Sequence, residues 1–342
     1  MSGQFDFYDY GPLLSRGAMI NMVVGGRGVG KTYGAKMYAL NQYLKKGAEF
    51  IYLRRYKTEL SAARGSFLAD LPAEVASQFE VKGSLVLWCE NPDESDRKKR
   101  RYRKAGYFVA LSTAMVQKSV AFPKVRTIIF DEVVLVPGSS IRYLAGELVA
   151  FLEFFNTVDR YQNRVRAILL GNAGSIACPY FAGFGIPLKG GEFRRGKTPD
   201  VIAHFPASVT FGEQVKQTRF GRLMRAVDES YEAYAIGNEF GDGGDELLLE
   251  KRPKGSTYQY TVIFAAGELS FYRYDGCGLW ATTERPRGAD LYTTEAELAD
   301  ETIGYAPLTG PRCQSSRWAF NAGNLRFASH SARSIFISSN VR

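Results

Sequence analysis

Residues 25 to 32 read Gly25-Gly26-Arg27-Gly28-Val29-Gly30-Lys31-Thr32 and directly follow an apolar run, Met19–Val24. They match G-x-x-x-x-G-K-[ST], the pattern of a phosphate-binding P-loop. Its glycines allow positive φ angles, so successive backbone N–H groups can point at phosphate oxygens. We therefore expect all eight residues to surround ATP, with Lys31 acting catalytically at the β- and γ-phosphates and Thr32 Oγ holding Mg²⁺.

The segments around this loop predict an α/β domain. Met19–Val24 has the pattern of a buried strand, and Lys31–Lys46 has that of an amphipathic helix whose positive end faces the anion. A second strand is predicted at Glu49–Arg54 and a second helix at Ser66–Phe79. Such alternation predicts a mostly parallel sheet with helices on both faces.

The composition indicates a globular protein large enough for two domains. Its 342 residues are 45% hydrophobic and 23% charged, which suffices for a full core. We find no signal-peptide pattern and no stretch long enough to cross a membrane, so we expect no membrane partner. Four scattered cysteines and two histidines argue against a zinc site or disulfides and for a reducing cytoplasm. The net charge of +9 fits a polyanionic partner or a basic surface kept for solubility.

A basic segment lies between two predicted hairpin strands, Leu85–Cys89 and Gly106–Leu111. From Arg97 to Lys104 every residue except Tyr102 is Lys or Arg. Such a charge run can be a solvated hairpin tip, or it can contact the phosphate backbone of a nucleic acid. The sequence leaves both interpretations open.

Asp131 and Glu132 follow a strongly apolar strand, Val125–Phe130. This is the pattern of a Walker B strand, in which Asp131 orients Mg²⁺ and Glu132 polarises the attacking water as a catalytic base. Two acids could also form a plain turn, but the preceding β-branched and apolar residues favour the catalytic interpretation. The second acid predicts an additional-strand (ASCE) ATPase rather than a small-molecule kinase.

Two polar residues beyond Walker B are candidate parts of the same site. A predicted helix at Tyr143–Val158 leads to Arg160, which can act as an arginine finger on a neighbouring subunit's ATP or be merely solvated. A strand at Val165–Leu170 then leads to Asn172, which is either a γ-phosphate sensor or an ordinary turn residue.

Several blocks of the chain resemble a known family, the DNA-packaging ATPases of small short-tailed phages of the phi29 type. The resemblance is dense over residues 15–225 and collinear to about 330. The blocks are Gly25–Tyr33, Phe50–Leu60, Ile129–Glu132, Gly171–Ala173, Pro179–Phe181, Thr218–Leu223, Glu250–Arg252 and Leu325–Phe327.

The resemblance implies a terminase-like motor. The family forms a homopentameric ring at the portal of a procapsid in the host cytoplasm and pumps double-stranded DNA inward with ATP, with a structural RNA as partner in its best-known members. Arg160 matches the family's trans-acting arginine, and Lys118 lies where a second trans-acting, nucleotide-contacting basic residue is found. The basic segment within 91–104 departs from the family pattern and inherits no role.

We expect the ATPase domain to span residues 1–205, a linker 206–244, and a C-terminal nucleic-acid-binding domain 245–342. Alternating runs from residue 256 to 283 predict antiparallel strands of a small α+β module. The resemblance implies a ribonuclease-H-like fold without nuclease chemistry. From Thr302 to Arg342 the chain has no Asp or Glu, and its arginines alternate with aromatic residues. They can form a nucleic-acid surface, or the aromatic residues can be core and the arginines solvated.

Three functions remain in competition. A packaging motor requires ATP hydrolysis stimulated by DNA and by oligomerisation. A P-loop small-molecule kinase would transfer phosphate to a nucleoside-sized substrate and would not need the basic C-terminal half. A nucleotide-dependent assembly protein would bind ATP without turnover.

Overall fold

The structure, a computed structural model, describes residues 8–114, 121–135, 141–144, 146–175, 178–187, 190–206, 218–219, 223, 248–274, 276 and 278–340. These residues fall into two compact units. The first contains the described residues up to Ala173 and resumes at Gly191, and the second joins Gly174–Gly190 to the C-terminal part of the chain. The prediction placed Gly174–Gly190 in the ATPase domain. The structure groups this segment with the second unit, because its helix α7 (Pro179–Phe184) packs against a C-terminal helix. The boundaries at 205 and 244 stay predictions.

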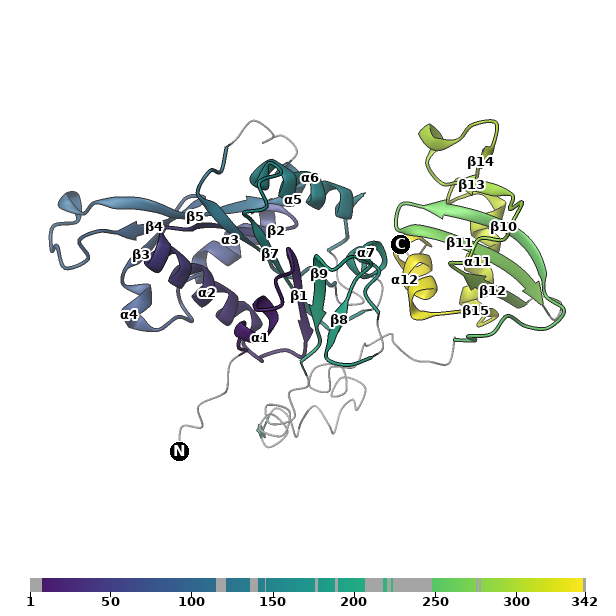
Figure 1. Ribbon diagram of the computed structural model, residues 1–342, viewed down its shortest axis with the longest axis horizontal. Coiled ribbons are helices and arrows are strands. Elements are labelled where there is room, and N and C mark those ends of the chain that lie inside the picture. Colours follow the sequence, from purple (N-terminus) through teal and green to yellow (C-terminus); the bar gives the residue numbers. More distant parts are fainter. Residues whose placement is uncertain are drawn as a thin grey trace. The chain divides into compact units, whose positions relative to one another are not determined.

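The first unit is built on a nine-stranded sheet (Figure 1). Its order is β3-β4-β5-β2-β6-β7-β1-β9-β8, and the six strands from β5 to β9 in this order are parallel. Strand β7 lies between the P-loop strand β1 and the Walker B strand β6, as the additional-strand prediction requires. The strands are β1 (Ile20–Gly25), β2 (Glu49–Arg54), β3 (Phe79–Lys82), β4 (Leu85–Cys89), β5 (Tyr102–Ala110), β6 (Val125–Phe130), β7 (Arg166–Asn172), β8 (Phe193–Arg195) and β9 (Val201–His204).

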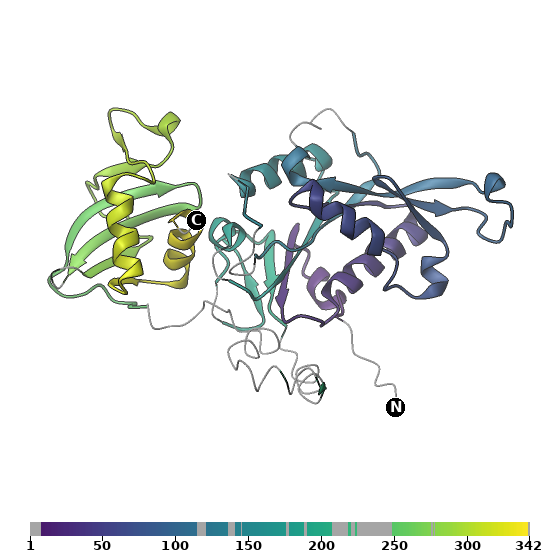
Figure 2. The same cartoon turned by 180° about the vertical axis from the view of Figure 1, so that it is seen from behind.

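Helices cover both faces of this sheet (Figure 2). Ile129 of β6 joins the core formed with α2, whereas its neighbour Phe130 faces the other way and stacks on Phe151 of α6 at 5.8 Å. Both residues are fully buried, which explains why the central strands are continuously apolar. The helices of this unit are α1 (Gly11–Leu14), α2 (Lys31–Lys46), α3 (Lys57–Ser66), α4 (Ala73–Ala76), η1 (Arg97–Lys99), α5 (Leu111–Ala114) and α6 (Glu147–Asp159).

The helix predicted at Ser66–Phe79 is wrong. A helix begins earlier, at Lys57, where the Glu59 side chain accepts a hydrogen bond from the Tyr56 N–H at 2.6 Å and so caps the helix. It ends at Ser66, and Pro72 precedes only the short helix α4. Proline disfavours helical backbone in the residue before it, so the chain cannot continue as one helix through this point.

The second unit contains a six-stranded sheet in the order β14-β13-β10-β11-β12-β15. Its first three strands are antiparallel, as predicted, and β13 and β14 are added parallel to β10. The resulting order 3-2-1-4-5 is that of a ribonuclease-H-like sheet, with β15 added next to β12. The elements are β10 (Thr257–Phe264), β11 (Gly267–Tyr274), β12 (Gly278–Thr282), β13 (Leu291–Thr293), η4 (Ala296–Leu298), β14 (Ile303–Tyr305), α11 (Pro311–Asn321), β15 (Leu325–Phe327) and α12 (His330–Asn340).

None of the helices within the described ranges is long and apolar enough to span a bilayer.

Candidate nucleotide site

A cavity of about 390 Å³ opens at the carboxyl ends of β1, β6 and β7. The P-loop contributes Arg27, Gly28, Gly30, Lys31 and Thr32 to its wall. The strand ends contribute the remaining predicted residues, Asp131, Glu132 and Asn172. The structure therefore brings together residues that are more than 100 positions apart in the chain, at the sheet edge where parallel α/β folds bind ligands.

The P-loop backbone has the conformation that its glycines were expected to allow. Gly28 and Gly30 have φ angles of 84° and 79°, in the left-handed region that other residues rarely adopt. Gly30 is the N-cap of α2, so the first turn of this helix faces the cavity. The remaining loop residues frame this turn: Gly25 ends β1, and Val29 is buried, its carbonyl oxygen accepting a 3.0 Å bond from the Tyr8 N–H.

Lys31 is buried and tied to the loop and to Asn172. Its Nζ donates to the carbonyl oxygens of Gly25 (3.0 Å) and Gly26 (2.6 Å) and to Asn172 Oδ1 (3.0 Å). Burial, with a smaller contribution from the charge of Arg27, lowers the pKa of Lys31 to about 8, although Asp131 opposes the shift. The ammonium is thus held in the cavity by groups that an incoming phosphate can replace.

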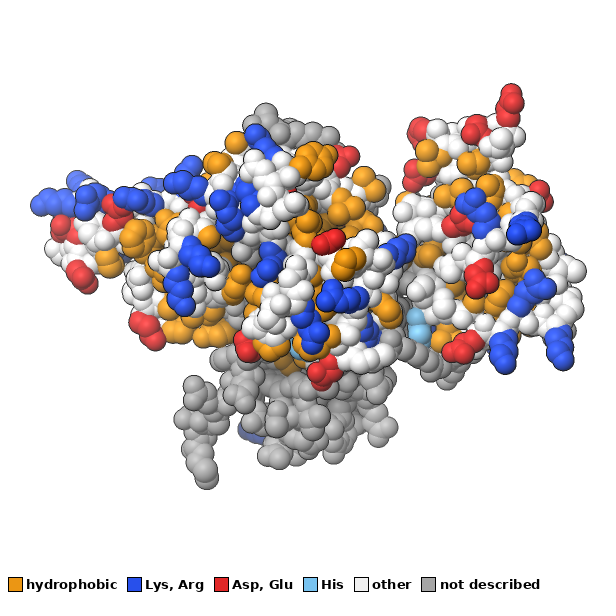
Figure 3. Space-filling model, in the orientation of Figure 1, with side chains coloured by type: hydrophobic (Ala, Val, Ile, Leu, Met, Phe, Trp, Pro, Cys, Tyr) orange, Lys and Arg blue, Asp and Glu red, His pale blue; other side chains and the backbone are white. Residues whose placement is uncertain are grey.

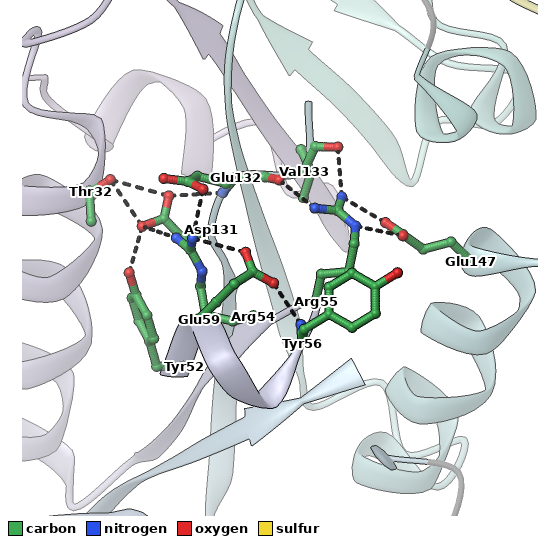
Figure 4. Close-up of polar contacts among 10 residues, drawn as sticks. All are labelled: Thr32, Tyr52, Arg54, Arg55, Tyr56, Glu59, Asp131, Glu132, Val133 and Glu147. Atoms are coloured by element: carbon green, nitrogen blue, oxygen red, sulfur yellow. Dashed lines mark hydrogen bonds and ion pairs between the residues drawn. The ribbon is translucent and has the colours of Figure 1, made fainter. Parts of the chain in front are cut away.

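Asp131 lies next to Thr32 in the wall of the cavity. The Thr32 hydroxyl lies 3.3 Å from both carboxylate oxygens, and the Tyr52 hydroxyl donates to Oδ2 at 2.5 Å (Figure 4). Burial raises the pKa of Asp131, while the Tyr52 hydrogen bond and the Arg54 charge counteract the rise. A threonine hydroxyl beside a carboxylate supplies the hard oxygen ligands that Mg²⁺ prefers, so these residues fit the ion.

Glu132 is the next residue but lies in a different environment. Its side chain is 52% exposed, its φ is 59°, and one carboxylate oxygen accepts a 2.6 Å ion-pair bond from Arg54. Arg54 also contacts Glu59 at 3.0 Å and Asp131 at 3.6 Å, so one guanidinium joins three carboxylates (Figure 4). A left-handed conformation at a residue other than glycine is costly and typical of functional sites.

The backbone of Glu132 is held by a second arginine, Arg55. Its guanidinium donates to the carbonyl oxygens of Glu132 and Val133, each at 3.2 Å. The same group pairs with both carboxylate oxygens of Glu147 at 2.7 and 2.9 Å, and both side chains of this pair are completely buried. The pair therefore fixes the first residue of α6 to the loop that follows Walker B.

Arg160 lies at the opposite end of α6 and does not line the cavity of its own chain. It is exposed, with a φ of 54°. The turn after it is held by Asp159, whose carboxylate accepts N–H bonds from Asn163, Arg164 and Val165 at 2.8–2.9 Å. Partial burial raises the pKa of Asp159, but these bonds outweigh it and lower the pKa overall. Arg160 is thus presented to solvent from an ordered turn.

A scan against protein-family models matches residues 3–340 to the Podovirus DNA encapsidation protein (Gp16) family. The chain belongs to this family. The DNA packaging protein of Bacillus phage phi29 is 32% identical over 303 residues, covering 87% of this chain and 85% of that protein. The solved bacteriophage phi29 genome packaging motor assembly contains a chain that is 29% identical, with a TM-score of 0.67 and coverage of 96% and 97%. The N-terminal domain of the phi29 DNA packaging ATPase is 33% identical, with a TM-score of 0.50, and covers 60% of this chain and 98% of its own.

Sequence reasoning missed the groups that hold the two acids in place. Tyr52, Arg54 and Arg55 were quoted only as part of a block that resembles the family, and Glu59 and Glu147 were not singled out. A usable signal was the pair of arginines directly at the end of a buried strand, where charge needs a partner. Lys118 was predicted to contact nucleotide, and it lies outside the described residues.

Some of the residues considered for a nucleic-acid surface in the C-terminal part are core residues instead. Phe327 and Phe336 are fully buried core residues, and Arg333 is buried, whereas Trp318 is 63% exposed. The Arg312 guanidinium stacks 3.8 Å above the Tyr292 ring. The spacing of the aromatic residues therefore reflects the packing of α11, α12 and β15 more than it reflects a surface on which nucleic-acid bases stack.

Acidic residues in the second unit form no nuclease-like group within the described ranges. Strand β10 carries no Asp or Glu, and no cluster of three or more His, Cys, Asp or Glu suited to a metal is found among the described residues. The prediction of lost nuclease chemistry can be tested at Asp275. This residue lies outside the described ranges.

Proposed function

We propose that this chain is an ATP-driven motor subunit that moves double-stranded DNA into a phage procapsid, hydrolysing ATP to ADP and phosphate. The observation that carries the proposal is the convergence of Lys31, Thr32, Asp131, Glu132 and Asn172 in one cavity, with β7 inserted between β1 and β6. Membership of a DNA encapsidation family, and relatives described as DNA packaging proteins, support DNA as the transported substrate.

Each residue has a role that its position supports. The P-loop N–H groups and Lys31 bind the phosphates, and Asn172, 3.0 Å from Lys31 Nζ, contacts the γ-phosphate. Thr32 and Asp131 would hold Mg²⁺, which would supply positive charge next to the phosphates. Glu132 accepts the proton of the attacking water as general base.

The ion pair between Arg54 and Glu132 bears on this last step. A carboxylate oxygen that accepts a 2.6 Å bond from a guanidinium is already engaged and is not free to take the proton of a water molecule. Glu132 must therefore leave Arg54, or share it, when it activates water. The half-exposed side chain of Glu132 has the freedom for this movement, whereas buried Asp131 does not.

The exposed position of Arg160 supports a ring in which each subunit completes its neighbour's site. We propose a homo-oligomer, a pentamer by family resemblance, that binds the portal of the procapsid in the host cytoplasm. Arg160, and Lys118 as a second basic residue, act in trans on the neighbour's ATP. A structural RNA is a further partner by resemblance to the family's best-known members.

The decisive experiment measures the ATPase rate with and without double-stranded DNA across a range of protein concentrations. A motor predicts a rate per subunit that rises with concentration and with DNA. ATP binding without turnover would instead indicate a nucleotide-dependent assembly protein, and phosphate transfer to a nucleoside would indicate a kinase.

Mixed subunits test the trans role of Arg160. Arg160→Ala and Glu132→Gln proteins should each be inactive alone, because an arginine finger and a general base contribute about 10³–10⁵-fold and 10²–10⁴-fold to the rate. Mixing them should restore part of the activity, since an intact Arg160 can then face an intact Glu132. A mixture that assembles but shows no rescue would contradict the trans role.

A further inference from the structure

The hairpin formed by β4 and β5 extends beyond the body of the first unit (Figure 1). Strand β5 pairs with β2 only from Gly106 to Ala110, so Tyr102–Lys104 pair with β4 alone. We call residues 90–104 the basic tip. It contains the loop with the short helix η1 and the first residues of β5, Tyr102–Lys104, which pair with β4 but not with β2, while β4 is also paired with β3 on its other edge.

Three of the four acidic residues of the basic tip are used to build it, and the fourth, Asp93, is exposed. Asp96 accepts the Lys98 N–H at 2.9 Å and caps the short helix η1, and the Glu94 carboxylate accepts the Asp96 N–H at 3.1 Å. Glu90 pairs with two neighbours, Arg101 and Arg103.

An asparagine closes the tip across its base. The Asn91 side chain accepts the Arg101 N–H at 2.8 Å and donates to the Lys99 carbonyl oxygen at 3.3 Å. A basic run of this kind need not have a fixed shape, but here side-chain bonds order it, which reduces the entropy lost when a ligand binds.

Four basic side chains are left without an acidic partner. Arg97, Lys98, Lys99 and Lys104 are exposed, and none of them forms an ion pair with any residue that the structure describes. The ammonium of Lys104 lies 5.9 Å from the centre of the Tyr107 ring. Figure 3 shows Lys and Arg side chains gathered along one edge of the projecting hairpin, with Asp and Glu below them. A polyanion can therefore contact these four side chains without breaking an ion pair inside the protein.

We propose that the basic tip contacts the phosphate backbone of double-stranded DNA through Arg97, Lys98, Lys99 and Lys104, an assignment that rests on the proposed packaging function. Duplex DNA is the occupant because it is the polyanion that the proposed function moves, and lysine and arginine contacts to phosphate predict binding without sequence preference.

The test uses the full-length protein and short duplexes, with affinity measured by fluorescence anisotropy at several salt concentrations. In a variant with Ser at positions 97, 98, 99 and 104, DNA affinity should fall. The slope of log K against log salt should become less steep by about 0.9 per lost phosphate contact, hence by about 3 to 4. The ATPase rate without DNA should equal that of the wild type, because the basic tip contributes no residue to the nucleotide cavity.

A matched pair of variants separates position from charge. Lys98→Ser with Lys99→Ser removes two charges from the tip, and Lys45→Ser with Lys197→Ser removes two exposed charges elsewhere in the same unit. Only the first should lower the salt slope, by about 2. An equal effect of both pairs, or an unchanged slope in the four-residue variant, would overturn the assignment to the tip.

Three further outcomes are informative. A duplex RNA of equal length that binds through the same four residues more tightly than DNA would refute the assignment to DNA. Wild-type protein that binds no duplex at low salt would refute the packaging function as well as the tip. Wild-type binding that the four-residue variant retains in full refutes the tip alone.

Discussion

Replacing Glu147 with Ala tests whether the loop after Walker B is held by the buried ion pair. The substitution removes both bonds to Arg55, at 2.7 and 2.9 Å, and the bond that Glu147 accepts from the Leu144 N–H at 2.9 Å. The remaining guanidinium stays completely buried beside the carbonyl oxygens of Glu132 and Val133, which are dipoles and carry no full negative charge. Removing one partner of such a pair costs about 3–5 kcal/mol, because a buried charge is left uncompensated.

The free energy of unfolding of the first unit is best followed by amide hydrogen exchange of β2 and β6 in increasing urea. For an m-value near 3 kcal/mol/M, the expected loss lowers the urea midpoint by about 1–2 M. Arg103→Ala is the control, since it removes a pair in the same unit whose arginine is 71% exposed, and exposed pairs contribute about 0–1 kcal/mol. If Glu147→Ala costs no more than this control, the buried pair does not hold the loop.

Three predictions concern the chemistry of the cavity. Glu132→Gln should keep ATP affinity and lose about 10²–10⁴-fold in turnover, whereas Lys31→Ala should lose both. Calorimetric titration measures the affinity and steady-state kinetics the turnover, and near wild-type turnover of Glu132→Gln would show that Glu132 is not the general base. Because the pKa of Lys31 is lowered to about 8, ATP affinity should fall as pH rises above about 8, by up to about tenfold per pH unit. Lys31→Arg, which stays charged, should abolish this fall, and a pH-independent affinity in the wild type would contradict the lowered pKa. Arg54→Ala should raise the pKa of Asp131 further, since the Arg54 charge lowers it. The acid limb of the ATPase pH profile should therefore move to higher pH in Arg54→Ala and stay in place in Arg54→Lys. An unmoved limb in Arg54→Ala would show that Asp131 does not sense this charge.

The same Lys31 shift has a consequence for stability. The unfolded chain binds a proton at this lysine up to its ordinary pKa of about 10.4, whereas the folded chain releases it near 8. Between these values the unfolded state binds more protons, so the contribution of Lys31 to stability rises with pH over this window. Below about pH 8 the full penalty for burying the charge is present.

Local chemistry explains which parts of the site could be predicted from the sequence. The P-loop is a contiguous segment whose glycines, lysine and threonine act together, and Asp131 and Glu132 end an unmistakably buried strand. Parallel strands bring their carboxyl ends to one edge, so a prediction of strands alone already places Asn172 with the loop. The structure confirms the mostly parallel sheet. This sheet could be predicted because each of these signals is local and periodic.

Signals that depend on tertiary partners could not be predicted in the same way. The aromatic residues at 327 and 336 are spaced like a surface motif, yet they are core because α12 and β15 pack together. Helix α7 follows the strand that carries Asn172 and was assigned to the ATPase domain, but its contacts are with α12. These partners are not visible from residues nearby in the chain, since Phe336 also packs on Phe271 of β11 and α7 packs on α12, each pair far apart in sequence.

The two arginines at the end of β2 show how one strand can serve two purposes. Successive side chains of a strand point to opposite faces, so Tyr52 and Arg54 face the same way, and both contact Asp131. Arg55 follows and faces the other way, toward Glu147 of α6. Arg54 therefore sets the charge around the acids, whereas Arg55 sets the backbone of Glu132. Because α6 begins at Glu147 and ends at Asp159, directly before Arg160, the residue that holds the loop after Walker B and the residue that we propose acts on a neighbour lie at the two ends of one helix. A shift of α6 in response to a neighbouring subunit would thus reach Glu132 through Arg55, without passing through the nucleotide.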